Sequence, residues 1–179
     1  RLNGAYVNWG NGAGARLIQG RATLVDAHTV QVNGQRHTAA HVLVATGGYP
    51  VVPDIEGREL VVTSDDMFDL DPFPKRLVVV GGGYIACEFA SIFHGLGAQV
   101  TQLVRAPQVL RGFDDEVRDF IAAEMRKAGV DLRTNAGVAA VRRSATGLQV
   151  QLKDGQILEA DTVLYATGRA PNVAGLGLE

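Results

Sequence analysis

The apolar positions in the middle of the chain change from a strand-like run to a helix-like stripe. Residues 77–80 (Leu-Val-Val-Val) form a short β-branched run bounded by glycine, which predicts a strand buried on both faces. A helix that closes at the glycines of 95–97 is predicted next, because apolar residues recur there at helical spacing: Ile85, Phe89, Ile92, Phe93 and Leu96. A second strand is predicted over 98–104, so these segments form a β-α-β unit.

A hairpin-like motif occurs on each side of this unit. Asn33-Gly34 precedes the apolar run 42–47, and Asp154-Gly155 precedes 163–168 at the same spacing; both runs end in Ala-Thr-Gly. Asn-Gly and Asp-Gly favour two-residue hairpin turns, so each copy predicts a hairpin and then a strand. Because glycine allows close backbone approach, we interpret both Ala-Thr-Gly ends as having one role. The alternative is that two unrelated meanders share tight turns.

A glycine-rich turn joins the first strand to the predicted helix. Gly81, Gly83 and Ala86 occupy this turn. In such a turn the first glycine permits the bend, the second lets backbone N–H groups approach a pyrophosphate, and a small third residue lets the helix pack on the strand. A lone glycine triplet is a weak signal, but this one lies within a complete β-α-β unit. We therefore predict a dinucleotide site.

The end of the second strand carries a basic residue where an NAD site would usually have an acidic one. Arg105 stands there, and Arg111 follows six residues later. Two guanidinium groups can clamp a ribose 2′-phosphate, and each charge-assisted hydrogen bond is worth roughly 1.5–3 kcal/mol. We therefore predict NADPH; the alternative is a pair of solvated surface arginines. A second helix is predicted from Asp114, which can cap it, to Gly129.

Composition and charge narrow the function classes. The 179 residues are 46% hydrophobic and contain one Cys, which excludes a disordered chain and a disulfide scaffold. The formal net charge of −2 supplies no broad attraction to nucleic acid or to an anionic membrane. No apolar run approaches the roughly 18 residues that span a bilayer. We expect a soluble, cytoplasmic protein without nucleic-acid or membrane partners, and a central fragment, since the first Met is Met67.

Together these motifs resemble the flavoprotein (pyridine nucleotide) disulfide oxidoreductases, most closely their glutathione reductase branch. The similarity covers nearly the whole chain, with matching stretches at 41–48, 81–88, 104–114 and 166–172. The resemblance implies an α/β fold in which a Rossmann-like NADPH-binding domain with a β-meander is inserted between pieces of an FAD-binding domain. The implied boundaries are 1–50 and 159–179 for the FAD pieces, 51–71 for a connector and 72–158 for the NADPH domain.

The resemblance also implies roles for particular residues. NADPH would contact the glycine turn, the two arginines and the second Ala-Thr-Gly end: Gly81, Gly82, Gly83, Tyr84, Ile85, Ala86, Glu88, Arg105, Arg111, Gly168 and Arg169. Tyr84 resembles the residue that covers the flavin until the nicotinamide displaces it. FAD would lie along Ala22, Thr46 and Gly47.

The residues that perform the family's disulfide chemistry are absent from this sequence. The family uses two nearby cysteines, whereas this chain has only Cys87, which we expect to be a buried small residue of the helix. The family's acid-base His-Glu pair, its FAD glycine fingerprint and its dimerisation domain have no counterpart, and the four His make no metal site. We therefore assign no catalytic residue and no metal.

The implied whole protein is a homodimeric enzyme that passes electrons from NADPH through FAD and a cysteine pair to glutathione disulfide. One alternative is a nucleotide-binding fragment without activity of its own. Another is a sister enzyme such as mercuric reductase, a trypanothione-type reductase or dihydrolipoamide dehydrogenase. The last is disfavoured, because its NAD site would want an acidic residue near Arg105.

Overall fold

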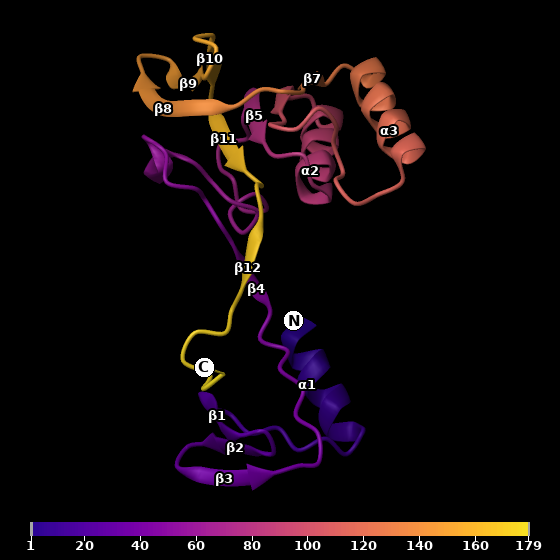
Figure 1. Ribbon diagram of the computed structural model, residues 1–179, viewed down its shortest axis with the longest axis vertical. Coiled ribbons are helices and arrows are strands. Elements are labelled where there is room, and N and C mark those ends of the chain that lie inside the picture. Colours follow the sequence, from indigo (N-terminus) through magenta and orange to yellow (C-terminus); the bar gives the residue numbers. More distant parts are fainter. Residues whose placement is uncertain (1, 179) are drawn as a thin grey trace. The chain divides into compact units, whose positions relative to one another are not determined.

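The computed structural model describes residues 2–178, which form two compact units (Figure 1). The first unit contains the chain up to Gly47 and again from Pro171 onward. The second unit contains Gly48–Ala170 and is therefore inserted within the sequence of the first. Strands β4 (Gly48–Pro50) and β12 (Arg169–Pro171) pair in a two-stranded sheet.

The first unit has one helix and one small antiparallel sheet. Helix α1 spans Leu2–Gly12, and the sheet has the order β1-β2-β3, with bounds Ala22–Asp26, Thr29–Val32 and Gln35–Thr38. The predicted two-residue turn at Asn33-Gly34 is confirmed, since both residues have positive φ and Val32 pairs with Gln35.

The strand predicted over 42–47 is wrong. This segment has no regular secondary structure, and Leu43 is 89% exposed. The corresponding run after the second hairpin does form a strand, because a parallel neighbour supplies its hydrogen bonds. Among the described residues no strand pairs with 42–47, so its apolar pattern alone does not hold it in a sheet.

The second unit is built on a four-stranded parallel sheet, which confirms the predicted α/β fold and its β-α-β unit. The strand order is β11-β5-β6-β7, with bounds Thr162–Tyr165, Arg76–Val80, Gln99–Leu103 and Asp131–Arg133. Helix α2 (Tyr84–Gly95) connects β5 to β6, and α3 (Asp115–Ala128) connects β6 to β7. The Asp114 carboxylate accepts the N–H groups of Glu116 and Val117, so the predicted cap is confirmed.

Helices α2 and α3 pack on one face of this sheet, and an antiparallel meander covers the opposite face. It has the order β10-β9-β8, with bounds Ile157–Ala160, Gly147–Leu152 and Val138–Ser144. The predicted two-residue turn at Asp154-Gly155 is wrong, because residues 153–156 separate β9 from β10. The Leu152 N–H donates to the Gln156 carbonyl at 2.8 Å, and the Asp154 carboxylate accepts the Gln156 N–H at 3.0 Å, which stabilises the longer turn.

The parallel sheet is therefore buried on both faces, as predicted. Leu77 and Val79 point to the helices, whereas Val78 and Val80 point to the meander. The prediction of which face of α2 is buried is partly wrong. Ile92 and Leu96 are mostly exposed, and the buried residues are Ala86, Cys87, Phe89, Ala90 and Phe93. The small Ala86 and Ala90 let the helix approach β5 and β6, and this turns Ile92 and Leu96 outward.

The segment expected to be a connector packs on the second unit. It contains the short helix η1 (Arg58–Leu60), and Val52, Ile55 and Val61 lie against the meander core. Gly57 has φ +81°, and a Cβ there would lie 1.8 Å from the Val141 carbonyl oxygen. The compact unit is thus wider than the predicted 72–158, while the assignment of cofactors to segments stays a prediction.

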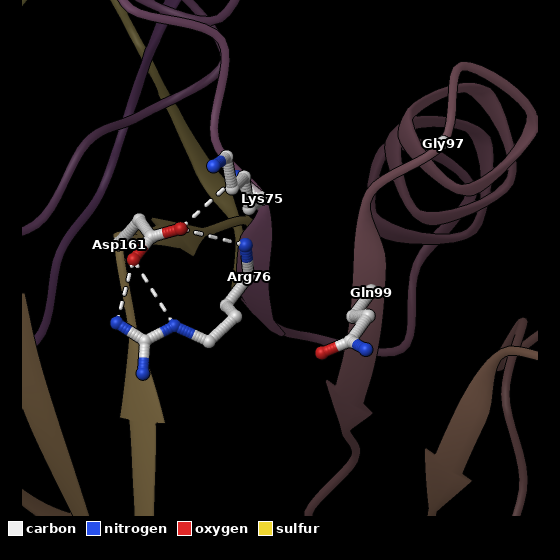
Figure 2. A pocket seen from close by; sticks show the side chains of 5 residues that line it. All are labelled: Lys75, Arg76, Gly97, Gln99 and Asp161. Carbon is white, nitrogen blue, oxygen red and sulfur yellow. Dashed lines mark hydrogen bonds and ion pairs between the residues drawn. The ribbon is translucent and has the colours of Figure 1, made fainter.

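Asp161 fastens the start of β11 to the start of β5 (Figure 2). Its Oδ2 accepts the backbone N–H groups of Lys75 at 3.0 Å and Arg76 at 2.8 Å, and its Oδ1 accepts from the Arg76 guanidinium at 2.7 Å. Burial acts to raise the pKa of Asp161, but the Arg76 side chain and the backbone donors outweigh it and lower that pKa. With Gly97 and Gln99, these three residues line a pocket of about 530 Å³.

No helix in residues 2–178 is both long enough and apolar enough to cross a membrane.

Candidate nucleotide-binding site

Three successive glycines follow β5, and the fold requires only the first two. Gly81 has φ +144°, and a Cβ there would lie 2.3 Å from the Ala166 carbonyl oxygen. A Cβ at Gly82 would lie 2.6 Å from Cγ1 of Val104. Gly83 has an ordinary φ of −79°, and nothing lies within 4 Å of where its Cβ would be. The missing side chain of Gly83 therefore leaves open space in front of α2.

The first turn of α2 has unsatisfied donors facing that space. Gly83 is the N-cap residue, and no side chain of the described chain caps the helix there. The first N–H groups of a helix have no partner within the helix, and the helix dipole adds partial positive charge at this end. The turn is therefore suited to an anionic group such as a phosphate.

A groove of about 920 Å³ lies over the glycine turn and the carboxyl ends of β5, β6 and β11. It is lined by most of the residues predicted to contact NADPH: Gly81, Gly82, Gly83, Tyr84, Ile85, Arg105, Arg111, Gly168 and Arg169. Ala86 instead lies fully buried beneath the turn, as expected of the small third residue. Glu88 is exposed on α2 and does not line the groove.

Among the described residues, the charged side chains that line the groove are all positive. Its lining includes Arg105, Arg111, Lys153 and Arg169, and the described residues that line it include no carboxylate. Arg105 and Arg111 are both exposed, and neither forms a hydrogen bond or an ion pair within residues 2–178. These two guanidinium groups are available to a ligand, and the groove favours a ligand with negative charge.

Lys153 was missed by sequence reasoning. It is the first residue of the turn between β9 and β10, far along the chain from the glycine turn. Its backbone N–H donates to the Gly137 carbonyl at 2.8 Å, and its side chain runs beside Gly137 into the groove lining. No local pattern signals this position, because it depends on how the meander folds back over the sheet.

The loop that carries the two arginines is fastened to the glycine turn. The Leu110 N–H donates to the Gly82 carbonyl at 2.5 Å, and Leu110 is buried with φ +54°. At the other end of the loop, the Asn135 N–H donates to the Ala106 carbonyl at 3.1 Å. The loop is therefore ordered before any ligand binds.

A buried amide supports the glycine turn from beneath. Gln102 of β6 has no exposed surface, and its Nε2 donates to the Gly81 carbonyl at 2.9 Å and to Cys87 Sγ at 3.6 Å. Burial raises the pKa of the Cys87 thiol, and the Gln102 hydrogen bond offsets this only in part. The prediction that Cys87 is a buried helix residue is confirmed, and the supporting role of Gln102 was not foreseen.

Two aromatic hydroxyl groups and one arginine complete the groove. Tyr84 is half exposed at the start of α2, whereas burial raises the pKa of Tyr165 to about 12. Arg169 donates to the Gly48 carbonyl and, at 3.3 Å, to Ser64 Oγ, and pairs with Asp65 at 3.8 Å. Arg169 is thus already held by the chain itself.

The residues predicted along FAD lie in the first unit. Ala22 begins β1 and is partly buried, while Thr46 and Gly47 are exposed in the segment without regular structure. FAD contact by these residues stays a prediction. Within the described residues, no group of three or more His, Cys, Asp or Glu is arranged to hold a metal ion.

Comparison with known proteins gives consistent matches. Residues 2–179 match the family described as pyridine nucleotide-disulphide oxidoreductase. The chain is 49% identical over 179 residues to a glutathione reductase of Burkholderia cepacia, covering 100% of this chain and 40% of that protein. It is 38% identical over 171 residues to a mercuric reductase of Staphylococcus aureus, covering 93% of this chain and 31% of that protein.

A solved structure also matches. The HOCl-induced flavoprotein disulfide reductase RclA from Escherichia coli superposes with a TM-score of 0.79 at 33% identity. That match covers 96% of this chain and 41% of RclA. The chain thus spans well under half of the length of each of these relatives.

Proposed function

Because the chain belongs to the pyridine nucleotide-disulphide oxidoreductase family, we propose that it is the NADPH-binding portion of an FAD-dependent disulfide reductase whose substrate is glutathione disulfide. The family uses FAD and NAD(P)H, and the glutathione reductase of B. cepacia is 49% identical to this chain. The choice of NADPH rests on the groove described above.

The observation that carries the proposal is that the charged side chains lining the groove at the start of α2 are all positive among the described residues. Arg105 and Arg111 extend from one loop beside the glycine turn, where the ribose 2′-phosphate of an adenine dinucleotide would come close to them. A carboxylate at the position of Arg105 would instead favour the 2′-hydroxyl of NADH. The lining contains no such group among its described residues.

The glycine turn also fits the pyrophosphate of a dinucleotide. Nothing in the fold demands glycine at position 83, where a Cβ would meet only open space. A ligand that approaches the backbone closely would require glycine at this position, and the unpartnered N–H groups of α2 would be its hydrogen-bond donors. The residues present therefore fit the nucleotide.

In the complete enzyme, bound NADPH supplies a hydride to the flavin. This chain's contribution is to hold the nucleotide: α2 binds the pyrophosphate, and Arg105 and Arg111 bind the 2′-phosphate. Tyr84 at the start of α2 would cover the flavin until the nicotinamide displaces it, and Ala22, Thr46 and Gly47 would lie along FAD. Arg169, which lines the groove, and Glu88, which does not, stay predicted contacts of NADPH.

The chain alone is expected to bind nucleotide without reducing a disulfide. Its single cysteine, Cys87, is buried, and burial raises the pKa of its thiol, which disfavours the reactive thiolate. The intact protein would be a homodimer. A mercuric reductase is the second candidate, because the S. aureus enzyme is 38% identical over 93% of the chain.

Titration calorimetry with NADPH and NADH tests the proposal. We expect NADPH to bind more tightly, and Arg105→Ala and Arg111→Ala each to weaken NADPH by about one to two decades, since each removes a charge-assisted hydrogen bond. Arg143→Ala is the matched control, because Arg143 is an exposed arginine of β8 outside the groove. Equal affinity of the unchanged chain for both nucleotides would contradict the assignment to NADPH.

A further inference from the structure

We propose that Arg118 of α3 is a positioning residue that sets the preference for NADPH over NADH without touching the nucleotide. This inference rests on the proposed function, since it concerns how the loop carrying Arg105 and Arg111 is held in place. Arg105 and Arg111 are both exposed, so the positions of their side chains depend on the loop backbone that joins them. Contacts from α3, from the glycine turn and from Asn135 fix this backbone.

Arg118 binds the middle of the loop. Its Nε donates to the Val109 carbonyl at 2.8 Å, and its side chain is only 15% exposed. Its Nη1 donates to Asp115 Oδ1 at 2.5 Å, which orients the planar guanidinium group toward Val109. Val109 itself is fully buried. The carbonyl of a buried residue needs a hydrogen-bond partner, and Arg118 supplies it.

The next residue transmits this contact to the phosphate turn. Leu110 has the left-handed φ of +54°, which an L-residue adopts only when its surroundings hold it there. Its N–H donates to the Gly82 carbonyl at 2.5 Å. Because Arg111 follows directly, the direction in which Arg111 leaves the backbone depends on the Leu110 conformation. Arg118 holds one side of that conformation, and Gly82 holds the other.

A second contact between α3 and the loop acts in the same sense. Gln108 lines the groove, and its Nε2 donates to Asp119 Oδ1 at 2.7 Å. Arg118 and Asp119 are neighbours on α3, so one turn of the helix holds two successive parts of the loop. The helix therefore acts as a rigid support, and the two arginines keep a fixed separation before the nucleotide arrives.

The test compares Arg118→Gln with Arg126→Gln. Arg126 is a matched control, because it belongs to the same helix and its Nε also donates to a backbone carbonyl, that of Leu132 at 3.3 Å, but away from the arginine loop. We expect Arg118→Gln to weaken NADPH about three- to tenfold and NADH by less than about twofold. Arg126→Gln should change the two affinities equally. Arg118→Lys, which keeps the charge, serves if the Gln variant does not fold.

Hydrogen exchange at the Leu110 amide gives a readout that needs no nucleotide. We expect Arg118→Gln to accelerate this exchange about tenfold in the unliganded chain, and Arg126→Gln to leave it unchanged. An unchanged NADPH preference in Arg118→Gln overturns the inference, whether or not the exchange rate rises. If the unchanged chain itself binds both nucleotides equally, the proposed function fails instead, so the two failures are distinguishable.

Discussion

A substitution at the third glycine of the turn, Gly83, distinguishes what the fold requires from what a bound ligand requires. Gly83 has φ −79° and ψ 175°, which any residue adopts, and a Cβ there would have no neighbour within 4 Å. Replacing glycine by alanine at a compatible position stabilises a protein by about 0.4–1 kcal/mol, because the unfolded chain loses freedom. Gly83→Ala is therefore expected to raise the free energy of unfolding of the unliganded chain.

The same methyl group would occupy the space that the pyrophosphate requires. Forcing a methyl into a filled site costs typically about 1–3 kcal/mol, which is roughly a five- to 150-fold loss of affinity. NADPH and NADH should lose affinity by the same factor, since both contain the pyrophosphate. Calorimetry and urea unfolding on one preparation measure both effects.

Two glycine variants serve as controls for Gly83→Ala. Gly95 lies at the end of α2 with open space around it, so Gly95→Ala should leave nucleotide affinity unchanged. Gly81→Ala should unfold the turn, because its Cβ would meet the Ala166 carbonyl at 2.3 Å. A Gly83→Ala variant that folds and binds NADPH as tightly as the unchanged chain would contradict close approach of the pyrophosphate to position 83.

Three further predictions concern stability and reactivity. Gly57→Ala should lower the free energy of unfolding by about 3 kcal/mol, because its Cβ would meet the Val141 carbonyl at 1.8 Å and φ is +81°; a urea midpoint equal to that of the unchanged chain would contradict this. The lowered pKa of Asp161 means that its contacts with Arg76 stabilise the fold above its ordinary pKa of 3.8 and are lost as the pH falls through the lower folded value. As the pH falls from 6 to 2.5, the free energy of unfolding measured with urea should therefore decrease more steeply in the unchanged chain than in Asp161→Asn, and identical slopes would contradict a stabilising role of the Asp161 contacts. Cys87 should react with a thiol reagent at pH 8 at least about tenfold more slowly in the folded chain than in urea, and equal rates would show that it is not buried.

Sequence reasoning succeeded where neighbouring residues decide the structure. The strand 77–80, the glycine turn and the Asp114 cap each carry a signal in a few neighbouring residues, and the structure contains each of them. Most of the residues predicted to contact NADPH also lie together in the groove, because the parallel strands bring their carboxyl ends to one edge of the sheet; their contact with NADPH stays a prediction.

It failed where distant partners decide. The apolar run 42–47 reads like the run that becomes β11, but β11 is a strand because it pairs with β5. Ile92 and Leu96 fit a helical stripe equally well, and only the close approach allowed by Ala86 and Ala90 selects the buried face. Lys153 belongs to the site through the folding of the meander, which no local spacing reveals.

The pairing of β11 with β5 also sets an order of events during synthesis. The ribosome releases β5 early, yet one of its two neighbours in the sheet is made only after both helices and the whole meander. Until then, a valine-rich strand presents an open edge that can pair with the wrong chain. Because the residues that follow β11 also line the groove, the nascent chain should gain its nucleotide pocket only when β11 and the residues after it emerge.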